Sequence, residues 1–63
     1  MTNEEERALY QEGLDLCDIL IAKATEEGND VEVSAQTTER LWLMWATYKL
    51  GVREWGEAHA SNT

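Results

Sequence analysis

Few residues in this 63-residue chain have side chains that could do chemistry. His59 is the sole imidazole, and it lies in a C-terminal segment without hydrophobic periodicity, where a solvated side chain is expected. Cys17 is the sole thiol and falls among apolar residues, where a free thiol packs as a small apolar group. The sequence has no phosphate-binding Gly-rich loop, no zinc-protease motif and no nucleophile with a nearby base. We therefore expect no catalytic residue, no cofactor and no enzymatic activity.

Acidic side chains are the only candidate metal ligands. Asp15 and Asp18, together with Glu5 and Glu12, could place carboxylates along one helix face for a divalent cation. No imidazole joins them, and acids on the outer face of a helix are ordinarily solvated. We expect no metal site.

Aromatic side chains are concentrated in residues 41–55, where they could stack on a nucleobase or another planar ligand. Packing in a hydrophobic core is the expected role of Trp45, Tyr48 and Trp55, because they share one helical face. Trp42 lies off that face and is the indole best placed to contact a partner. A protein that sequesters a small ligand or nucleotide stays open as a weaker alternative.

The charge of the chain is strongly acidic and unevenly distributed. Residues 1–32 carry ten acids against two basic residues, which accounts for the net charge of −8, and residues 33–63 carry three acids against three basic residues. Affinity for nucleic acid comes mainly from Lys and Arg. We therefore expect no direct nucleic-acid binding, and an acidic surface instead favours a protein partner with a basic surface.

The chain is expected to be cytoplasmic, without contact to a membrane. It has no run of about 18 apolar residues, and its N-terminus is acidic where a signal peptide would be basic. A single cysteine excludes an internal disulfide, and 63 residues is near the lower size at which a chain folds alone. Oligomerisation is then the remaining way to stabilise the fold.

The hydrophobic pattern predicts two helices in a single domain, residues 1–63. Thr2 and Asn3 are candidate N-caps with acids three residues later, as in a capping box. The first helix should span about 3–27, and Gly28 should take the left-handed conformation that ends it.

The second helix is predicted to begin after an extended connector over residues 28–34. Ser34 or Thr37 should provide its N-cap, and the helix should span about 35–56. Residues 57–63 have no hydrophobic period and are expected to be a frayed tail.

The second helix carries two apolar stripes. One should pack on the first helix as the core of the hairpin, with Trp45 as the most buried indole, and it consists of Leu41, Met44, Trp45, Tyr48, Val52 and Trp55. The stripe keeps its phase beyond Gly51, which predicts that the helix continues through that glycine. A partner helix covers only one stripe, so the other should serve self-association, and it consists of Leu43, Ala46 and Leu50. The expected fold is an all-α antiparallel two-helix hairpin that pairs into a homodimeric four-helix bundle.

These surfaces predict a small, acidic, non-enzymatic regulator or inhibitor that self-associates and docks on a larger protein, a size and charge typical of phage and mobile-element proteins. The predicted contact centre is Trp42 flanked by Lys49 and Arg53, with Asp15 and Asp18 as a steering field. The alternative is a structural or accessory subunit, whose apolar stripes are covered only inside a larger assembly.

Overall fold

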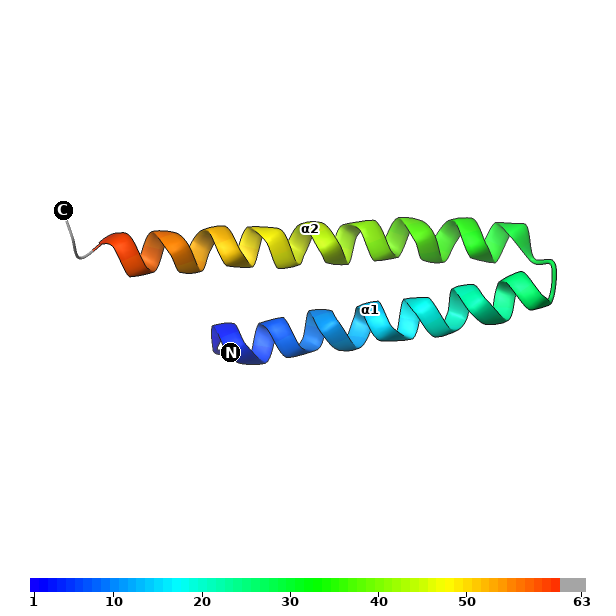
Figure 1. The fold of residues 1–63 in the computed structure, drawn as a ribbon, viewed down its shortest axis with the longest axis horizontal. Helices are drawn as coiled ribbons and strands as arrows, with labels where there is room; N and C mark the ends of the chain where they lie inside the picture. The colour runs from blue at the N-terminus through cyan, green and yellow to red at the C-terminus, as the bar shows by residue number, and fades with distance from the viewer. Residues whose placement is uncertain (61–63) are drawn as a thin grey trace.

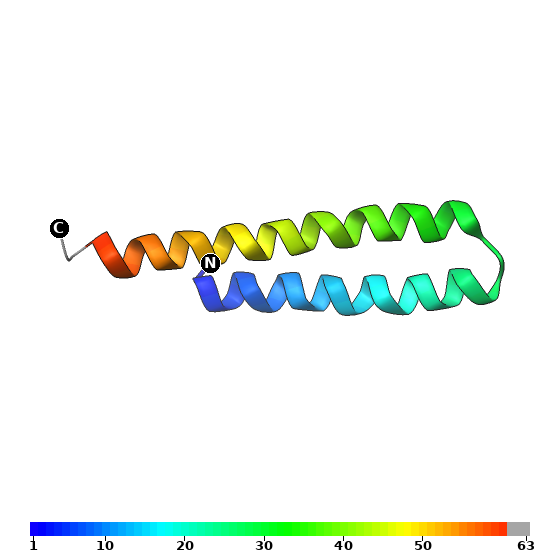
Figure 2. The same ribbon diagram turned by 45° about the horizontal axis from the view of Figure 1, so that its top comes forward.

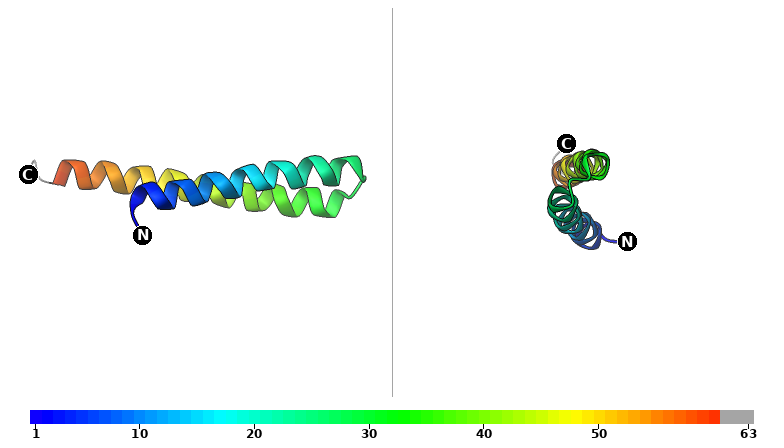
Figure 3. Two further views of the ribbon diagram at one scale, coloured as in Figure 1. Left: turned by 90° about the horizontal axis from the view of Figure 1, so that it is seen from below. Right: turned by 90° about the vertical axis from the view of Figure 1, so that its right-hand side faces the viewer.

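The computed structural model describes residues 1–60 and consists of two helices, α1 (Asn3–Glu26) and α2 (Asp30–Ala60). The helices lie side by side and antiparallel, joined at one end by a short turn (Figure 1, Figure 2). They cross one another along their length (Figure 3), in a body that measures 54 × 16 × 13 Å. At the end away from the turn, α2 extends past the start of α1 (Figure 1). The predicted all-α hairpin is confirmed.

A capping box begins α1. The Thr2 hydroxyl accepts a hydrogen bond from the Glu5 backbone N–H at 3.1 Å, and the Glu5 carboxylate accepts one from the Thr2 backbone N–H at 3.4 Å. These bonds satisfy amide groups that have no partner within the first turn of a helix. The capping-box prediction is confirmed, with Thr2 as the N-cap.

Three residues join the two helices. Glu27 is the C-cap of α1, and Gly28 follows it with φ of 69°, a conformation that glycine adopts without strain because it has no Cβ. The N–H groups of Gly28 and Asn29 donate to the carbonyls of Thr25 and Ala24 at 3.1 and 2.9 Å, which is the Schellman pattern of a helix end. The predicted role of Gly28 is confirmed.

The prediction of an extended connector over residues 28–34 is wrong, because most of that segment belongs to α2. The Asn29 side-chain oxygen accepts a hydrogen bond from the Glu32 N–H at 3.2 Å and so caps the second helix directly after the turn. Ser34 and Thr37, the predicted caps, therefore lie inside α2.

The C-terminal half of α2 runs without a break through Gly51 to Ala60. The predicted continuation through Gly51 is confirmed. The predicted end near residue 56 is wrong, because residues 57–60 are helical and their two alanines favour that conformation. Residues 61–63 of the predicted tail lie outside the described part of the chain.

The contact between the helices is built from small residues on α1 and leucines on α2. Cys17, Ala24 and Leu50 are buried, and Leu50 is only 2% exposed. A Cβ on Gly13 would lie 2.9 Å from Cδ1 of Leu43, so any side chain at that position would force Leu43 to move. The helices approach closely because small α1 residues leave room for the leucines.

The inward and outward stripes of α2 are the reverse of those predicted. Trp45 is the least exposed indole, but it is still 54% exposed, and Trp55 at the end of the same stripe is 65% exposed. Leu43, Ala46 and Leu50, predicted to serve self-association, lie on the side of α2 that faces α1. The physical reason is size, because the space beside the small α1 residues fits an isobutyl group and not an indole.

Leu50→Ala should lower the free energy of unfolding by about 2–5 kcal/mol, because it removes a buried side chain and leaves a cavity. The matched control is Ile19→Ala, which removes an aliphatic side chain that is 64% exposed and should cost less than about 1 kcal/mol. Urea denaturation followed by circular dichroism measures both values. Equal losses in the two variants would contradict the placement of Leu50 in the core.

Candidate protein interface

The face of α2 that points away from α1 carries a continuous row of large apolar side chains. This outer stripe consists of Leu41, Trp45, Tyr48, Val52 and Trp55. At about 100° per residue the five positions share one side of the helix, and each side chain is at least 49% exposed. Soluble monomers rarely expose contiguous apolar patches of more than a few hundred Å². The outer stripe is therefore the candidate interface.

Ring contacts order the outer stripe. The rings of Trp45 and Tyr48 are stacked, with centroids 5.5 Å apart, and Nζ of Lys49 lies 5.7 Å from the Trp45 centroid, within the range of cation–π attraction. Nearer the C-terminus the His59 ring stacks on Trp55, with centroids 4.0 Å apart. These contacts favour defined orientations of the Trp45 and Trp55 rings.

The centre of the outer stripe carries little charge. Between residues 41 and 52 Lys49 is the only charged residue. The cores of protein interfaces are depleted of charged residues and enriched in aromatic ones. The composition of this face is thus that of an interface core and not that of a solvated helix face.

Trp42 lies on one flank of the outer stripe. It is 65% exposed, and it lines an open, mainly apolar hollow with Thr38, Leu41 and Trp45. Lys49 lies two helical turns further along the same flank. Two of the five predicted partner-binding residues, Trp42 and Lys49, thus lie on the same flank of α2, and the Lys49 ammonium contacts the ring of Trp45 between them.

The other three predicted partner-binding residues make contacts within the hairpin. Arg53 donates a hydrogen bond to the Glu6 carboxylate at 2.9 Å, and Asp18 accepts one from Nε of Arg40 at 2.9 Å. Asp15 accepts one at 2.9 Å from a glutamine one turn earlier in α1. Arg53 and Asp18 are therefore engaged in hydrogen bonds between α1 and α2.

The two predicted acids are also separated in space from Trp42. Arg40, which binds Asp18, lies about 200° from Trp42 around α2. Asp15 is about 200° around α1 from the buried Cys17 and so faces away from α2. These acids can attract a partner over a distance, but they do not form one patch with Trp42.

Two ion pairs near the open end of the hairpin hold the helices together. Arg7 binds both carboxylate oxygens of Glu54, with Nη1 3.0 Å from Oε2. Arg53 lies 2.9 Å from Glu6 and also donates to the Asn3 side-chain oxygen at 3.0 Å. These pairs were not predicted from the sequence, although opposite charges at similar distances from the turn are a weak signal for them.

The ion pairs shift the pKa values of the groups that form them. The bond from Arg7 lowers the pKa of Glu54. Hydrogen bonds from Arg53 and, to a smaller extent, from the Tyr10 hydroxyl lower the pKa of Glu6. These shifts move both pKa values further below neutral pH, so both groups are negatively charged partners of the arginines at neutral pH.

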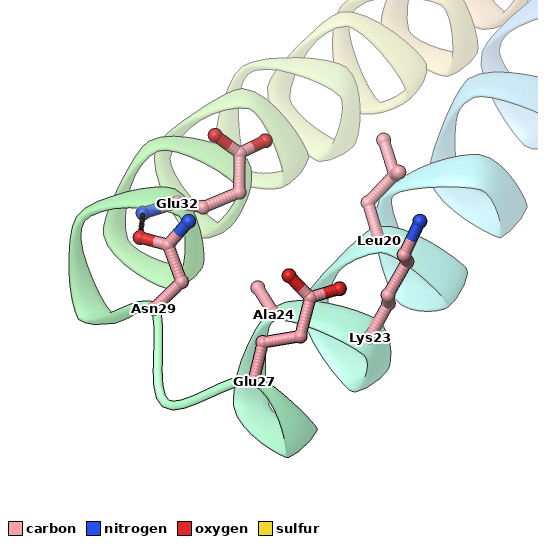
Figure 4. Close-up of a pocket in the computed structure, with 6 residues that line it drawn as sticks. All are labelled: Leu20, Lys23, Ala24, Glu27, Asn29 and Glu32. Carbon is pink, nitrogen blue, oxygen red and sulfur yellow. Dashed lines mark hydrogen bonds between the residues drawn. The ribbon is translucent and has the colours of Figure 1, made fainter.

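A hollow beside the turn is lined in part by polar and charged side chains. It is lined by Leu20, Lys23, Ala24, Glu27, Asn29 and Glu32. In Figure 4 the two carboxylates and the ammonium group do not converge on one point, and the hydrogen bond drawn is the Asn29 cap of α2. Within residues 1–60 no group of three or more His, Cys, Asp or Glu side chains is placed to hold a metal ion.

Comparison of the chain with protein-family models, curated proteins and solved structures finds no match. In the described part of the chain, neither helix has both the length and the apolar character that crossing a membrane requires. The outer stripe and its flanks are therefore the features of the hairpin that bear on function.

Glu54→Gln should lower the thermal midpoint at neutral pH, and its effect should shrink as the pH falls below 4.5, the ordinary pKa of this carboxyl. Because Arg7 lowers the pKa of Glu54 in the folded state, the stabilisation is fully present above the unfolded pKa and is lost as the pH falls through the lower folded value. Thermal melting of parent and variant, followed by circular dichroism from about pH 7 to about pH 3, measures the difference between their thermal midpoints at each pH.

The matched control is Glu12→Gln, which removes an exposed acid of α1 outside the ion pairs between the helices. This change only relieves repulsion in an acidic chain, so it should not lower the midpoint at neutral pH. If the difference in thermal midpoint between the parent and Glu54→Gln stayed constant down to about pH 3, the structural role of the ion pair between Arg7 and Glu54 would be contradicted.

Proposed function

We propose that this chain is a small, acidic, non-enzymatic regulator or inhibitor that acts by binding protein: it self-associates and docks on a larger partner. The observation that carries the proposal is the exposed outer stripe of α2, with its stacked rings and its low charge. Acids are concentrated in the first half of the chain, where they maintain solubility while the apolar face is available for contact.

The exposed apolar surface supports self-association. Within residues 1–60, twelve large hydrophobic side chains are exposed, and burying one of them fully is worth about 1.5–3 kcal/mol. Covering even part of this set would add more stability than the small core of one hairpin. We therefore infer a homodimer, to which each hairpin contributes two helices.

Docking on the larger partner is proposed to centre on Trp42, with Lys49 on the same flank of α2. Tryptophan is enriched among the residues that dominate binding energy in protein interfaces. The acids of α1, Asp15 among them, supply a field that raises the rate of encounter with a basic surface. Arg53 and Asp18 contribute indirectly, because they hold the two helices in place.

The size of the core supports a second candidate function, that of a structural or accessory subunit. The buried hydrophobic core within residues 1–60 consists of Cys17, Ala24 and Leu50. A subunit of a larger assembly would gain the rest of its core from its neighbours, and its folding would depend on their concentration. A cooperative thermal transition of the purified chain favours the regulator, and its absence favours the subunit.

Trp42→Ala should abolish capture of the larger partner and leave helicity and oligomeric mass unchanged, because Trp42 lies off the outer stripe. Loss of such an indole typically costs at least about 2 kcal/mol of binding energy, roughly a 30-fold loss of affinity. Immobilised parent and variant are exposed to an extract of the source cells, and the proteins retained by each are quantified. The matched control is Met44→Ala on the opposite flank of α2, which should retain the same proteins as the parent.

Asp15→Lys should slow association with the captured partner at low salt and leave dissociation unchanged, as expected for a steering charge. Unlike a change at Asp18, it leaves the ion pair with Arg40 intact.

Equal retention of proteins by the parent and by Trp42→Ala would contradict docking through Trp42. Loss of oligomeric mass in that variant would assign Trp42 to self-association instead.

A further inference from the structure

The hairpin exposes more surface than a compact protein of its mass. Its accessible surface is 4898 Å² for 7.2 kDa, whereas a compact monomer of that mass exposes roughly 4,100 Å². The excess is about 800 Å², which is the area that each partner contributes to an interface of standard size. Burial in one ordinary interface would therefore remove the excess.

The distribution of charge favours one face for contact between two copies. α1 carries seven acids against two basic residues, whereas α2, which includes Asp30 and Glu32, carries five acids against three basic residues. Contact through α1 would bring two strongly negative helices together. Contact through the outer stripe places both α2 helices at the centre and separates the α1 helices by about 20 Å or more, well beyond the screening length of about 8 Å at physiological salt.

We propose that a second copy of this chain binds antiparallel along the outer stripe, with the two-fold axis beside Tyr48. This inference rests on the self-association part of the proposed function and names its surface. The residues of the outer stripe have the 4, 3, 4, 3 spacing of a coiled-coil seam, and Tyr48 is the central one. In a two-fold contact of this kind the central residue meets its own copy.

The sizes of the side chains fit the antiparallel arrangement. With Tyr48 on the axis, Trp45 faces Val52 of the second copy, and Trp55 faces Leu41 of the second copy. Each indole then packs on an aliphatic side chain, the alternation of large and small groups that close packing needs. A parallel arrangement would instead force each indole against its own copy.

Two glycines inside α2 support a close approach on this side. A Cβ built on Gly51 or on Gly56 meets nothing within 4 Å, so packing on α1 requires neither glycine. A glycine inside a helix costs about 1 kcal/mol relative to alanine. Gly51 lies beside the outer stripe between Tyr48 and Val52, where the missing side chain allows a second helix to come near.

Cysteine cross-linking tests both the surface and the orientation. All variants carry Cys17→Ala, which removes the native thiol. Tyr48→Cys should form a disulfide-linked dimer on oxidation, because residue 48 meets its own copy. Leu41→Cys alone should not, because its two copies lie about 20 Å apart along the axis, whereas an equimolar mixture of Leu41→Cys and Trp55→Cys should cross-link.

Leu16→Cys is the matched control on α1, because Leu16 is 55% exposed and Tyr48 is 61% exposed. It should remain without a cross-link under the same oxidation. A dimer linked through Leu16→Cys, with Tyr48→Cys unlinked, would overturn the proposal by placing the contact on α1. Self-linking of Leu41→Cys would overturn the antiparallel orientation.

Sedimentation equilibrium of the unmodified chain and of Tyr48→Glu gives an independent test. The unmodified chain should reach twice 7.2 kDa, and a charge at the centre of the seam should raise the dimer Kd by at least about 30-fold. A chain that stays at 7.2 kDa at every concentration would overturn this inference. Capture of the larger partner through Trp42 could still hold in that case, so the two failures are distinguishable.

Discussion

Close contact between the helices at small side chains is the constraint on which the rest of the structure depends. Gly13, Cys17 and Ala24 remove bulk from the inner face of α1, so that α2 comes near enough to bury Leu50 and to set Leu43 against Gly13. Aliphatic side chains fit this space, and indoles do not. The exposed aromatic face of α2 is therefore a consequence of how α2 packs on α1.

The hairpin itself could be predicted from the sequence because its signals are local. The spacing of Thr2 and Glu5 marks the start of α1, and Gly28 marks its end. The start of α2 could not be predicted in the same way, because Asn29 has two roles. Its backbone N–H completes the end of α1 while its side chain caps α2, so no separate capping residue stands between the helices.

The inward face of α2 and the composition of the candidate site could not be predicted, because both depend on residues of the other helix. Both stripes of α2 have helical spacing, and hydrophobicity alone favours the aromatic one. Which stripe faces inward depends on the side chains of α1 that lie opposite it, as with Gly13 opposite Leu43. The pairing of Arg53 with Glu6 has only a weak sequence signal, their similar distances from the turn, because the pair forms only where α2 packs on α1.

The three-residue turn makes folding of the hairpin a local event. The contacts beside Gly28 join residues that are close in sequence, whereas Arg7 and Glu54 are 47 residues apart. If the contacts form outward from the turn, little chain entropy is lost at any one step. Helical proteins with such local contacts fold in microseconds to milliseconds. Two proteins associate with a rate constant of roughly 10⁵–10⁷ M⁻¹s⁻¹. At micromolar concentration, association is therefore far slower than this folding. For a hairpin that pairs with itself, the rate of dimer formation would therefore be limited by protein concentration and not by the rate of folding.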